Sequence, residues 1–279
     1  MDGSQTENRL NRADENITDD RSPIFIGGHH RSGTTLMRVM LHRHPEIACG
    51  PESQLLEHTS FMEFHQYLED TWMPMFERLG MDQNDVDHAL GMFMDNFFTR
   101  YAAQRDKQRW GEKTPKNIFR LEYLFRLFPR AKFIHMIRDP RDIHCSVMEK
   151  ARTTTDRWTG ITAERTAERW MSAIERGRPW RISADKYLEV RYEDLTAQPV
   201  LTSRRVLDFL GESWSDAVLE GQSTYRGNVN RTIFTTSVRR WTRDLSRRDR
   251  TTIESIAGAG MRELGYEVLA DSSASSHAF

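Results

Sequence analysis

The chain has little of what several common protein classes need. Only Cys49 and Cys145 among its 279 residues are cysteine, too few for a disulfide framework or a cysteine-rich metal cluster. The formal net charge is −1, so no overall attraction to nucleic acid is expected. No apolar run approaches membrane-spanning length, and residues 1–21 lack the apolar core of a signal peptide. These absences favour a soluble, cytoplasmic protein with no nucleic-acid partner and no transmembrane segment.

Composition also suggests the domain boundaries. Residues 1–21 and 269–279 have the low hydrophobicity that is typical of disordered tails. Between them, a chain of this length with 38% hydrophobic residues overall can bury one large core. We therefore expect a single domain over residues 22–268, flanked by two disordered tails.

The stretch Pro23–Arg38, PIFIGGHHRSGTTLMR, is the most informative part of the sequence. It begins as a short apolar run, passes through glycines and continues as a helical pattern from Thr34. A strand, a glycine loop and a helix N-terminus can hold an oxyanion, because the backbone approaches the ligand closely and helical N–H groups point at it. An ATP-type P-loop has lysine after its last glycine, whereas here Thr34 and Thr35 follow Gly33. We predict a diester or anhydride with less terminal charge than ATP; the alternative is a tight turn without a ligand.

A carboxylate follows the next predicted strand. A helix ends near Pro45, residues 47–49 form a short apolar strand, and Glu52 lies just beyond it. Ligands of parallel α/β sheets bind beyond the carboxyl ends of the strands, so Glu52 can share a crevice with the glycine loop. A solvated loop charge or a helix N-terminal glutamate is the alternative.

Residues 55–110 are rich in methionine and aromatic residues at helical spacing. Such stripes are usually core, because Met and large rings fill the gaps between helices. The functional alternative is an apolar acceptor pocket, and both hold if this helical insertion lies above the crevice. The polar stretch Trp110–Asn117 follows, and its Lys113 and Pro115 are typical of a surface turn because proline is disfavoured in a strand.

A second anion signal follows the buried strand predicted at residues 131–137. Arg138 ends this strand, and residues 139–140, Asp-Pro, suit the start of a helix. The helix face that can meet a ligand carries Asp142, Ser146 and Lys150. The strand thus delivers a guanidinium and the helix a hydroxyl, although a surface helix held by salt bridges has the same pattern.

The remaining elements complete the fold class. Residues 187–195 are predicted as a strand and residues 200–210 as a helix closed by Gly211. Strands that alternate with helices specify a doubly wound parallel sheet. We expect an α/β fold: a three-layer P-loop-type parallel sheet flanked by helices, with a helical insertion after the second strand. Residues 152–160 are interpreted as a lid or a solvated linker, and residues 227–245 as a phosphate-contacting loop or a solvated basic face.

These motifs together resemble the sulfotransferases that use 3′-phosphoadenosine 5′-phosphosulfate (PAPS), most closely the tyrosylprotein sulfotransferases and their bacterial relatives. The resemblance covers residues 23–266 and includes FIGG, RSGTTLMR, HPE, CG, the RD of residues 138–139, YE, LDFLG and WSDAVL in order. Residues that it assigns to PAPS, and to its product adenosine 3′,5′-bisphosphate, are Arg31, Ser32, Gly33, Thr34, Thr35, Arg138, Ser146, Tyr192 and, from a loose alignment, Arg231.

The resemblance also implies roles within the site. Residues 31–35 would hold the 5′-phosphosulfate, and Arg138 would bind the 3′-phosphate with Ser146. Glu52 falls at the position of the catalytic base, and Lys113 where a lysine supports the bridging oxygen of the leaving group.

The transfer chemistry agrees with these roles. In-line transfer gains most from positioning and from cations on the leaving phosphate, which Arg31 and Lys113 can supply as catalytic residues. Glu52 can take the acceptor's proton if a dry site raises its pKa. No metal-ligand motif is present, so we propose no metal.

Departures from the family pattern bear on the acceptor. Tyrosylprotein sulfotransferases use arginines to grip acidic peptides, and this chain has Gln54 and His58 instead. We therefore expect a hydroxyl of a small-molecule, lipid or glycan acceptor, with peptide tyrosine or a non-catalytic nucleotide-binding protein as alternatives. A small-molecule kinase is disfavoured by Thr34, and a homodimer is compatible with the sequence. We also expect His30, which adjoins Arg31, to border the sulfuryl site.

Overall fold

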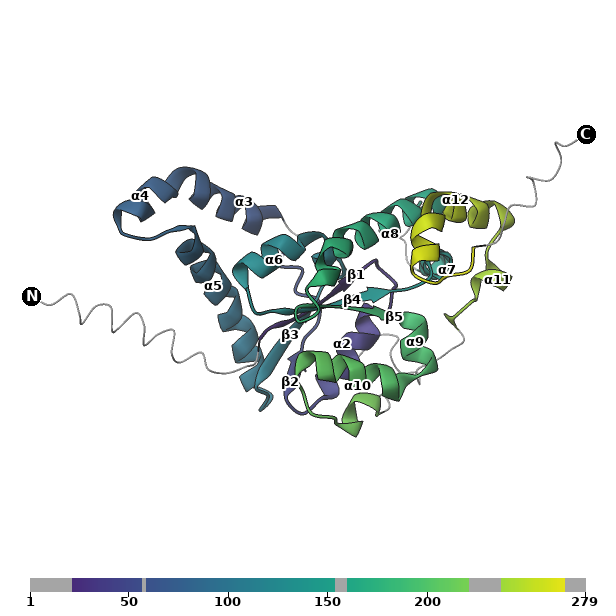
Figure 1. The fold of residues 1–279 in the computed structure, drawn as a ribbon, viewed down its shortest axis with the longest axis horizontal. Coiled ribbons are helices and arrows are strands. Elements are labelled where there is room, and N and C mark those ends of the chain that lie inside the picture. The colour runs from purple at the N-terminus through teal and green to yellow at the C-terminus, as the bar shows by residue number, and fades with distance from the viewer. Residues whose placement is uncertain (1–21, 57–58, 154–159, 221–236, 269–279) are drawn as a thin grey trace, which may run out of the picture.

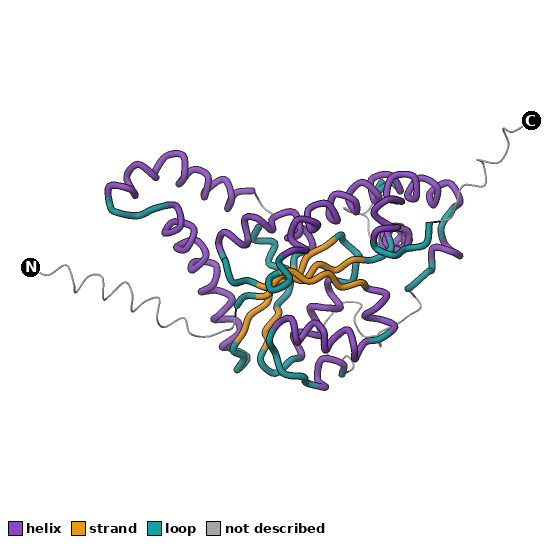
Figure 2. Tube along the Cα trace, viewed as in Figure 1, coloured by secondary structure: helices purple, strands orange, loops and turns teal. Residues whose placement is uncertain are grey.

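The computed structural model describes residues 22–56, 59–153, 160–220 and 237–268. These residues form a five-stranded parallel sheet in the order β2-β3-β1-β4-β5, with β1 between β3 and β4 (Figures 1 and 2). The strands are β1 (Ile24–Gly28), β2 (Ile47–Cys49), β3 (Arg109–Lys113), β4 (Lys132–Ile137) and β5 (Tyr187–Arg191). The predicted parallel α/β architecture is confirmed.

Helices lie on both sides of this sheet (Figure 1). They are α2 (Thr34–Arg43), α3 (Thr59–Tyr67), α4 (Met73–Arg78), α5 (Gln83–Ala103), α6 (Leu121–Leu127), α7 (Pro140–Thr153), α8 (Ala163–Gly177), α9 (Tyr192–Ala197), α10 (Pro199–Leu210), α11 (Trp241–Asp244) and α12 (Arg247–Glu263). Helices α3 to α5, with a π-helical turn at Leu68–Trp72, are the predicted insertion after β2 and form an arm that projects from the sheet. Among the described residues, no helix combines the length and apolar character needed to cross a bilayer.

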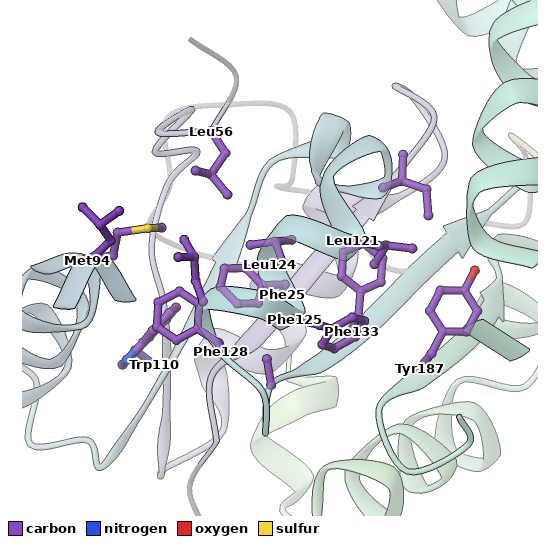
Figure 3. Packing of buried hydrophobic residues seen from close by; sticks show 14 of the residues in the cluster. Phe25, Leu56, Met94, Trp110, Leu121, Leu124, Phe125, Phe128, Phe133 and Tyr187 are labelled. Carbon is purple, nitrogen blue, oxygen red and sulfur yellow. The ribbon is translucent and has the colours of Figure 1, made fainter. Parts of the chain in front are cut away.

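Two hydrophobic layers enclose the sheet because successive strand side chains point to opposite faces. Ile24 and Ile26 of β1 pack in one cluster with side chains of α2, α9 and α10. Phe25 points the other way, into a cluster with residues of α5 and α6 (Figure 3). Its ring lies 5.5 Å from those of both Trp110 and Phe128, measured between centroids. β1 is therefore buried on both faces, which fixes the start of the glycine loop.

The strand β3 corrects the sequence interpretation of a surface turn near residues 110–117. Residues 109–113 form a buried strand between β2 and β1, and Pro115 lies beyond its end, at the start of a short 3-10 helix (Pro115–Arg120). The strand is polar, but its charges have partners. Arg109 donates to the carbonyl oxygens of Ser22 and Leu210 at 2.6 and 2.7 Å. A charged sequence can thus occupy the interior, where hydrophobic periodicity gives no signal.

Other boundaries differ less from the prediction. β5 ends at Arg191, and residues 192–195, which were expected to continue it, belong to α9. Cys49 and Cys145 are free and buried, as small apolar residues would be, and burial raises the pKa of Cys49 to about 12. The predicted tails, the lid or linker at residues 154–159 and most of the basic loop lie outside the described residues.

Candidate active site

The glycine loop reaches the carboxyl edge of the sheet directly from β1. Gly28 has a φ of 141°, and a Cβ there would lie 2.3 Å from the carbonyl oxygen of Met136. Gly33 has a φ of 94°, and a Cβ there would lie 2.5 Å from Cδ2 of Tyr192. Both positions require glycine for this backbone path. α2 begins at the next residue with no side-chain cap and no acidic residue in its first turn, so its N-terminus suits an anion.

Arg138 joins the glycine loop to the second predicted anion site. Its side chain is buried at the end of β4, and its Nη1 donates to the carbonyl oxygen of Arg31 at 3.0 Å. Its Nη2 donates to the carbonyl oxygen of Ser237 at 2.6 Å, and the guanidinium lies 4.5 Å from the centroid of the Tyr192 ring. Arg31 in turn donates from Nε to Oγ of Ser146 at 2.9 Å. The two sequence signals therefore form one continuous site.

The donors of this site fit an anion with several acceptor oxygens. Oγ of Ser32 and Nε of Arg138 are buried with no hydrogen-bond partner among the described residues, which is uncommon for polar atoms in a folded interior. Desolvation, and then the charge of Arg138, lower the pKa of Arg31, because two guanidinium groups share a small volume. A bound anion would accept hydrogen bonds from Ser32 and Arg138. Its negative charge would also offset the repulsion between the Arg31 and Arg138 guanidinium groups.

A second group of charges lies where β2 and β3 end. Nζ of Lys113 donates to Oε1 of Glu52 and, at 3.3 Å, to Oγ1 of Thr35 in the first turn of α2. Lys113 is buried, and 28% of the Glu52 side chain is exposed. The lysine thus connects the glycine loop to the predicted base, as the shared crevice requires.

The pKa of Glu52 differs from the sequence expectation. Burial raises it, but the hydrogen bond and charge of Lys113 outweigh burial and lower the pKa below its usual 4.5. The expected raised pKa is therefore wrong for this state of the site, because the cation pairs with the carboxylate. The charge of His30 acts in the same direction, and the place of this residue at the border of the sulfuryl site stays a prediction.

Glu112 holds the loop that carries Glu52. Its Oε1 accepts from the backbone N and from Oγ of Ser53, at 3.2 and 2.9 Å, and from Oγ1 of Thr114 at 2.7 Å. Thr114 also accepts from the backbone N of Gln54 at 3.3 Å. Burial raises the pKa of Glu112, whereas these hydrogen bonds oppose the rise. Glu112 is a structural anchor that the polar composition of its strand concealed.

Asp142 has a different role from the one its helix face suggested. Its Oδ2 accepts from the backbone N of Arg239 at 2.8 Å, and its Oδ1 from that of Trp241 at 3.0 Å. Asp142 therefore fixes the segment that carries Ser237 against α7. The predicted helix start is confirmed, since Oδ1 of Asp139 accepts from the backbone N of Arg141 at 2.9 Å.

Most of the predicted site residues meet at this edge of the sheet. The contacts above connect Arg31, Thr35, Glu52, Lys113, Arg138, Ser146 and Tyr192, and Ser32 and Gly33 lie in the glycine loop between Arg31 and α2. Thr34 is buried at the start of α2. Arg231 lies outside the described residues, as does His58. The anchoring roles of Glu112 and Ser237 were missed, because each depends on a contact between distant segments.

Comparisons with known proteins agree with this geometry. Residues 23–216 match a model of the Sulfotransferase family. The chain is 34% identical over 204 residues to protein-tyrosine sulfotransferase 2 of Gallus gallus, covering 70% of this chain and 53% of that protein. It is 33% identical over 199 residues to protein-tyrosine sulfotransferase 1 of Danio rerio, covering 70% and 55%. The chain spans about half the length of these relatives.

Solved structures share the fold. The sulfotransferase domain from the curacin biosynthetic pathway has a TM-score of 0.61 at 18% identity, with 88% of this chain and 98% of that chain covered. The sulfotransferase domain from the Synechococcus PCC 7002 olefin synthase has a TM-score of 0.57 at 23% identity, covering 84% and 94%. Mouse sulfotransferase SULT7A1, solved with PAP, has a TM-score of 0.55 at 14% identity, covering 87% and 85%. These similarities concern the fold alone, but the family match spans the glycine loop, Glu52, Lys113, Arg138 and Tyr192. The chain belongs to the Sulfotransferase family.

Proposed function

We propose that this protein is a sulfotransferase that moves the sulfuryl group of PAPS to a hydroxyl oxygen. One observation carries the proposal: Nζ of Lys113 contacts both Thr35, in the first turn of α2 just after the glycine loop, and Glu52, just beyond β2. The Lys113 ammonium therefore contacts both Thr35, which would help to hold the donor, and Glu52, which can take the proton from the acceptor hydroxyl. The family match and the PAP in the mouse structure support this donor.

The donor-binding residues divide between two ends of the nucleotide. Residues 31–35 and the N-terminus of α2 would hold the 5′-phosphosulfate, and Arg138 and Ser146 the 3′-phosphate. The proposal is supported by the hydrogen bonds from Arg138 to the Arg31 carbonyl and from Arg31 to Ser146, because these residues could then contact one nucleotide. PAPS supplies a sulfuryl group activated as a mixed anhydride with its 5′-phosphate.

The protein's own groups account for the charges that move during transfer. Glu52 accepts the hydroxyl proton as the acceptor oxygen forms its bond to sulfur. The bond between sulfur and the bridging oxygen breaks, and Lys113 and Arg31 stabilise the electron pair that leaves with adenosine 3′,5′-bisphosphate. Lys113 contacts Thr35 directly after the glycine loop, so its ammonium would be available to the leaving oxygen of a donor held by residues 31–35.

The acceptor with the best support is the phenol of a protein tyrosine. The relatives described above are named protein-tyrosine sulfotransferases, which favours this alternative over the small-molecule, lipid or glycan acceptor expected from Gln54.

Two measurements test the proposal. Calorimetry is expected to show binding of adenosine 3′,5′-bisphosphate and no comparable binding of ATP, and radiolabelled PAPS should transfer its label to tyrosine peptides. Glu52→Gln should abolish transfer while leaving bisphosphate affinity nearly unchanged. Glu63→Gln, a matched change on the exposed side of α3, should retain full activity. Full activity in Glu52→Gln would remove Glu52 as the base, and preference for ATP would overturn the donor assignment.

A further inference from the structure

An apolar groove lies beside Glu52, between the Glu52 loop and the helical arm. Its volume is about 860 Å³. It is lined by Ser53, Gln54, Leu55, Ser60, Phe61, Phe64, Leu68, Phe76, Met81, Val86, Ala89, Leu90 and Phe93. None of these described lining residues is charged. The volume falls in the range of about 300–1,000 Å³ that is typical of ligand sites, and leaves room for more than one phenol ring.

The groove and the base share a loop. Gln54 and Ser53, the two residues after Glu52, line the groove, and Gln54 contributes to lowering the pKa of Glu52. Gln54 has a φ of 55°, an unusual conformation for a residue with a side chain, and its backbone N is held by Thr114. The loop therefore holds Gln54 in place, and the groove begins at the residue next to the reacting carboxylate.

Aromatic rings form the outer part of the groove. Phe61 of α3 and Phe93 of α5 stack with their centroids 6.4 Å apart and their planes at 18°. Phe93 is 54% exposed and Phe64 is 51% exposed. Exposed rings beside a groove of this size can gain free energy by contact with an apolar ligand.

The opposite side of α3 is lined by charged side chains, so the apolar lining is confined to the side that faces the groove. His65, Glu69 and Arg126 line a separate charged cleft there, and Arg126 pairs with Asp87 at 2.7 Å. The charged side chains of this cleft therefore line a different pocket from the apolar groove. An acidic acceptor segment would have to bring its charges onto Phe61, Phe64 and Phe93 without a described lining cation to pair with them.

We propose that the groove binds large apolar side chains that flank the acceptor tyrosine, so that this enzyme recognises tyrosine in an uncharged, hydrophobic segment and not in an acidic one. The inference rests on the proposed function, since it takes a tyrosine phenol at Glu52 as given. Apolar contact along Phe61 and Phe93 replaces charge pairing as the source of acceptor selectivity.

Two peptides of equal length that differ only in the residues beside a central tyrosine test this inference. One carries Leu and Phe, the other Asp and Glu. We expect kcat/KM for the apolar peptide to exceed that for the acidic peptide by about tenfold or more, the discrimination an apolar pocket provides. Phe93→Glu should lower kcat/KM for the apolar peptide about tenfold, mainly through KM. The matched control Met92→Glu, at a neighbouring position that is 45% exposed and does not line the groove, should leave it unchanged.

The outcomes separate this inference from the proposed function. Unchanged affinity of both variants for adenosine 3′,5′-bisphosphate shows that they are folded. Preference for the acidic peptide, or equal kcat/KM in Phe93→Glu and Met92→Glu, overturns the inference and leaves sulfuryl transfer intact. Transfer to a free hydrophobic phenol and to neither peptide overturns the peptide assignment. Bisphosphate binding with no transfer to any hydroxyl overturns the proposed function itself.

Discussion

The guanidinium of Arg138 donates to the main-chain carbonyl of Arg31 at 3.0 Å, across 107 residues of sequence. Arg31 has a φ of 69°, a conformation that residues with a Cβ rarely adopt, so its backbone needs support from elsewhere in the fold. Arg138 gives that support and lies against Tyr192 as well. The residue assigned to one end of the donor therefore also shapes the loop assigned to the other end.

Replacement of Arg138 by lysine is expected to affect both ends of the donor. A lysine keeps the charge but cannot make the two carbonyl hydrogen bonds and the face-on contact with Tyr192 together. We expect Arg138→Lys to weaken adenosine 3′,5′-bisphosphate binding by about 10- to 100-fold, as measured by calorimetry. Arg152→Lys, at an exposed position near the end of α7, serves as the control and should bind normally. Affinity within about twofold of the native value in Arg138→Lys would exclude this linking role.

Replacing Ser32, whose hydroxyl has no partner among the described residues, should reduce ligand affinity without reducing the stability of the fold. Removing Oγ loses no hydrogen bond of the free protein, so Ser32→Ala should retain or slightly raise the free energy of unfolding. Bisphosphate affinity should nevertheless fall, by about fivefold or more. Ser203, whose Oγ is also buried without a partner but lies on α10, offers a matched control. Ser203→Ala should leave affinity unchanged, and an equal loss in both variants would contradict a ligand contact by Ser32.

The sequence predicts those parts of the fold in which local pattern and burial agree. β1, β2 and β4 are apolar strands next to helices with clear starts, and the sequence pattern predicts each of them. Their order in the sheet was not predicted, because β3 lies between β2 and β1. The pairing of Arg31 with Ser146 was expected only as a shared ligand, and it exists as a direct hydrogen bond. The proximity of the two sites was predictable because parallel strands present their carboxyl ends at one edge.

The sequence fails where distant partners make polar residues acceptable in the interior. β3 reads as a turn because Arg109, Glu112 and Lys113 are charged, and their burial depends on partners such as Ser22 and Ser53. The same cause produced the wrong sign for the pKa of Glu52. Burial alone would raise it, and the lysine that lowers it lies 61 residues away in sequence. Pairings of this kind are properties of the assembled sheet.

Lys113 should set the pH range in which Glu52 acts. Burial raises the pKa of Glu52 and Lys113 lowers it below 4.5, so removing the ammonium leaves burial to dominate. In Lys113→Met, Glu52 is therefore protonated at higher pH, and the acid limb of kcat/KM should move upward by about one pH unit or more. kcat itself should fall, because the leaving oxygen loses a cation.

A matched lysine distinguishes this effect from a general change in charge. Lys186→Met removes a cation just before the amino end of β5, away from the carboxyl edge of the sheet, and should leave the pH profile in place. An acid limb that stays fixed in Lys113→Met, measured with saturating donor and limiting acceptor, would show that Glu52 does not govern it.

His135 should make the fold sensitive to mild acid. It is buried in β4, its Nδ1 lies 2.6 Å from Oη of Tyr187, and burial lowers its pKa from 6.5 to about 3. Between these values the unfolded chain binds a proton that the folded chain does not, so stability falls as pH falls. For this residue alone the free energy of unfolding should decrease by about 1.4 kcal/mol per pH unit within that window. His29 and His42, with pKa values that burial lowers to about 4, add to the slope.

Denaturant unfolding of His135→Gln at a series of pH values isolates this contribution. Glutamine keeps a polar group near Tyr187 but does not titrate. Between pH ~6.5 and ~4, the free energy of unfolding of this variant should therefore change less steeply with pH than that of the native protein, by about 1.4 kcal/mol per pH unit. Ile134→Val, a conservative change at the adjacent buried position, controls for simple loss of packing. It should lower the free energy of unfolding by about 1 kcal/mol at every pH and leave the slope unchanged. If His135→Gln behaves in the same way as Ile134→Val, with a uniform offset and the native slope, His135 is not the group that couples folding to acid.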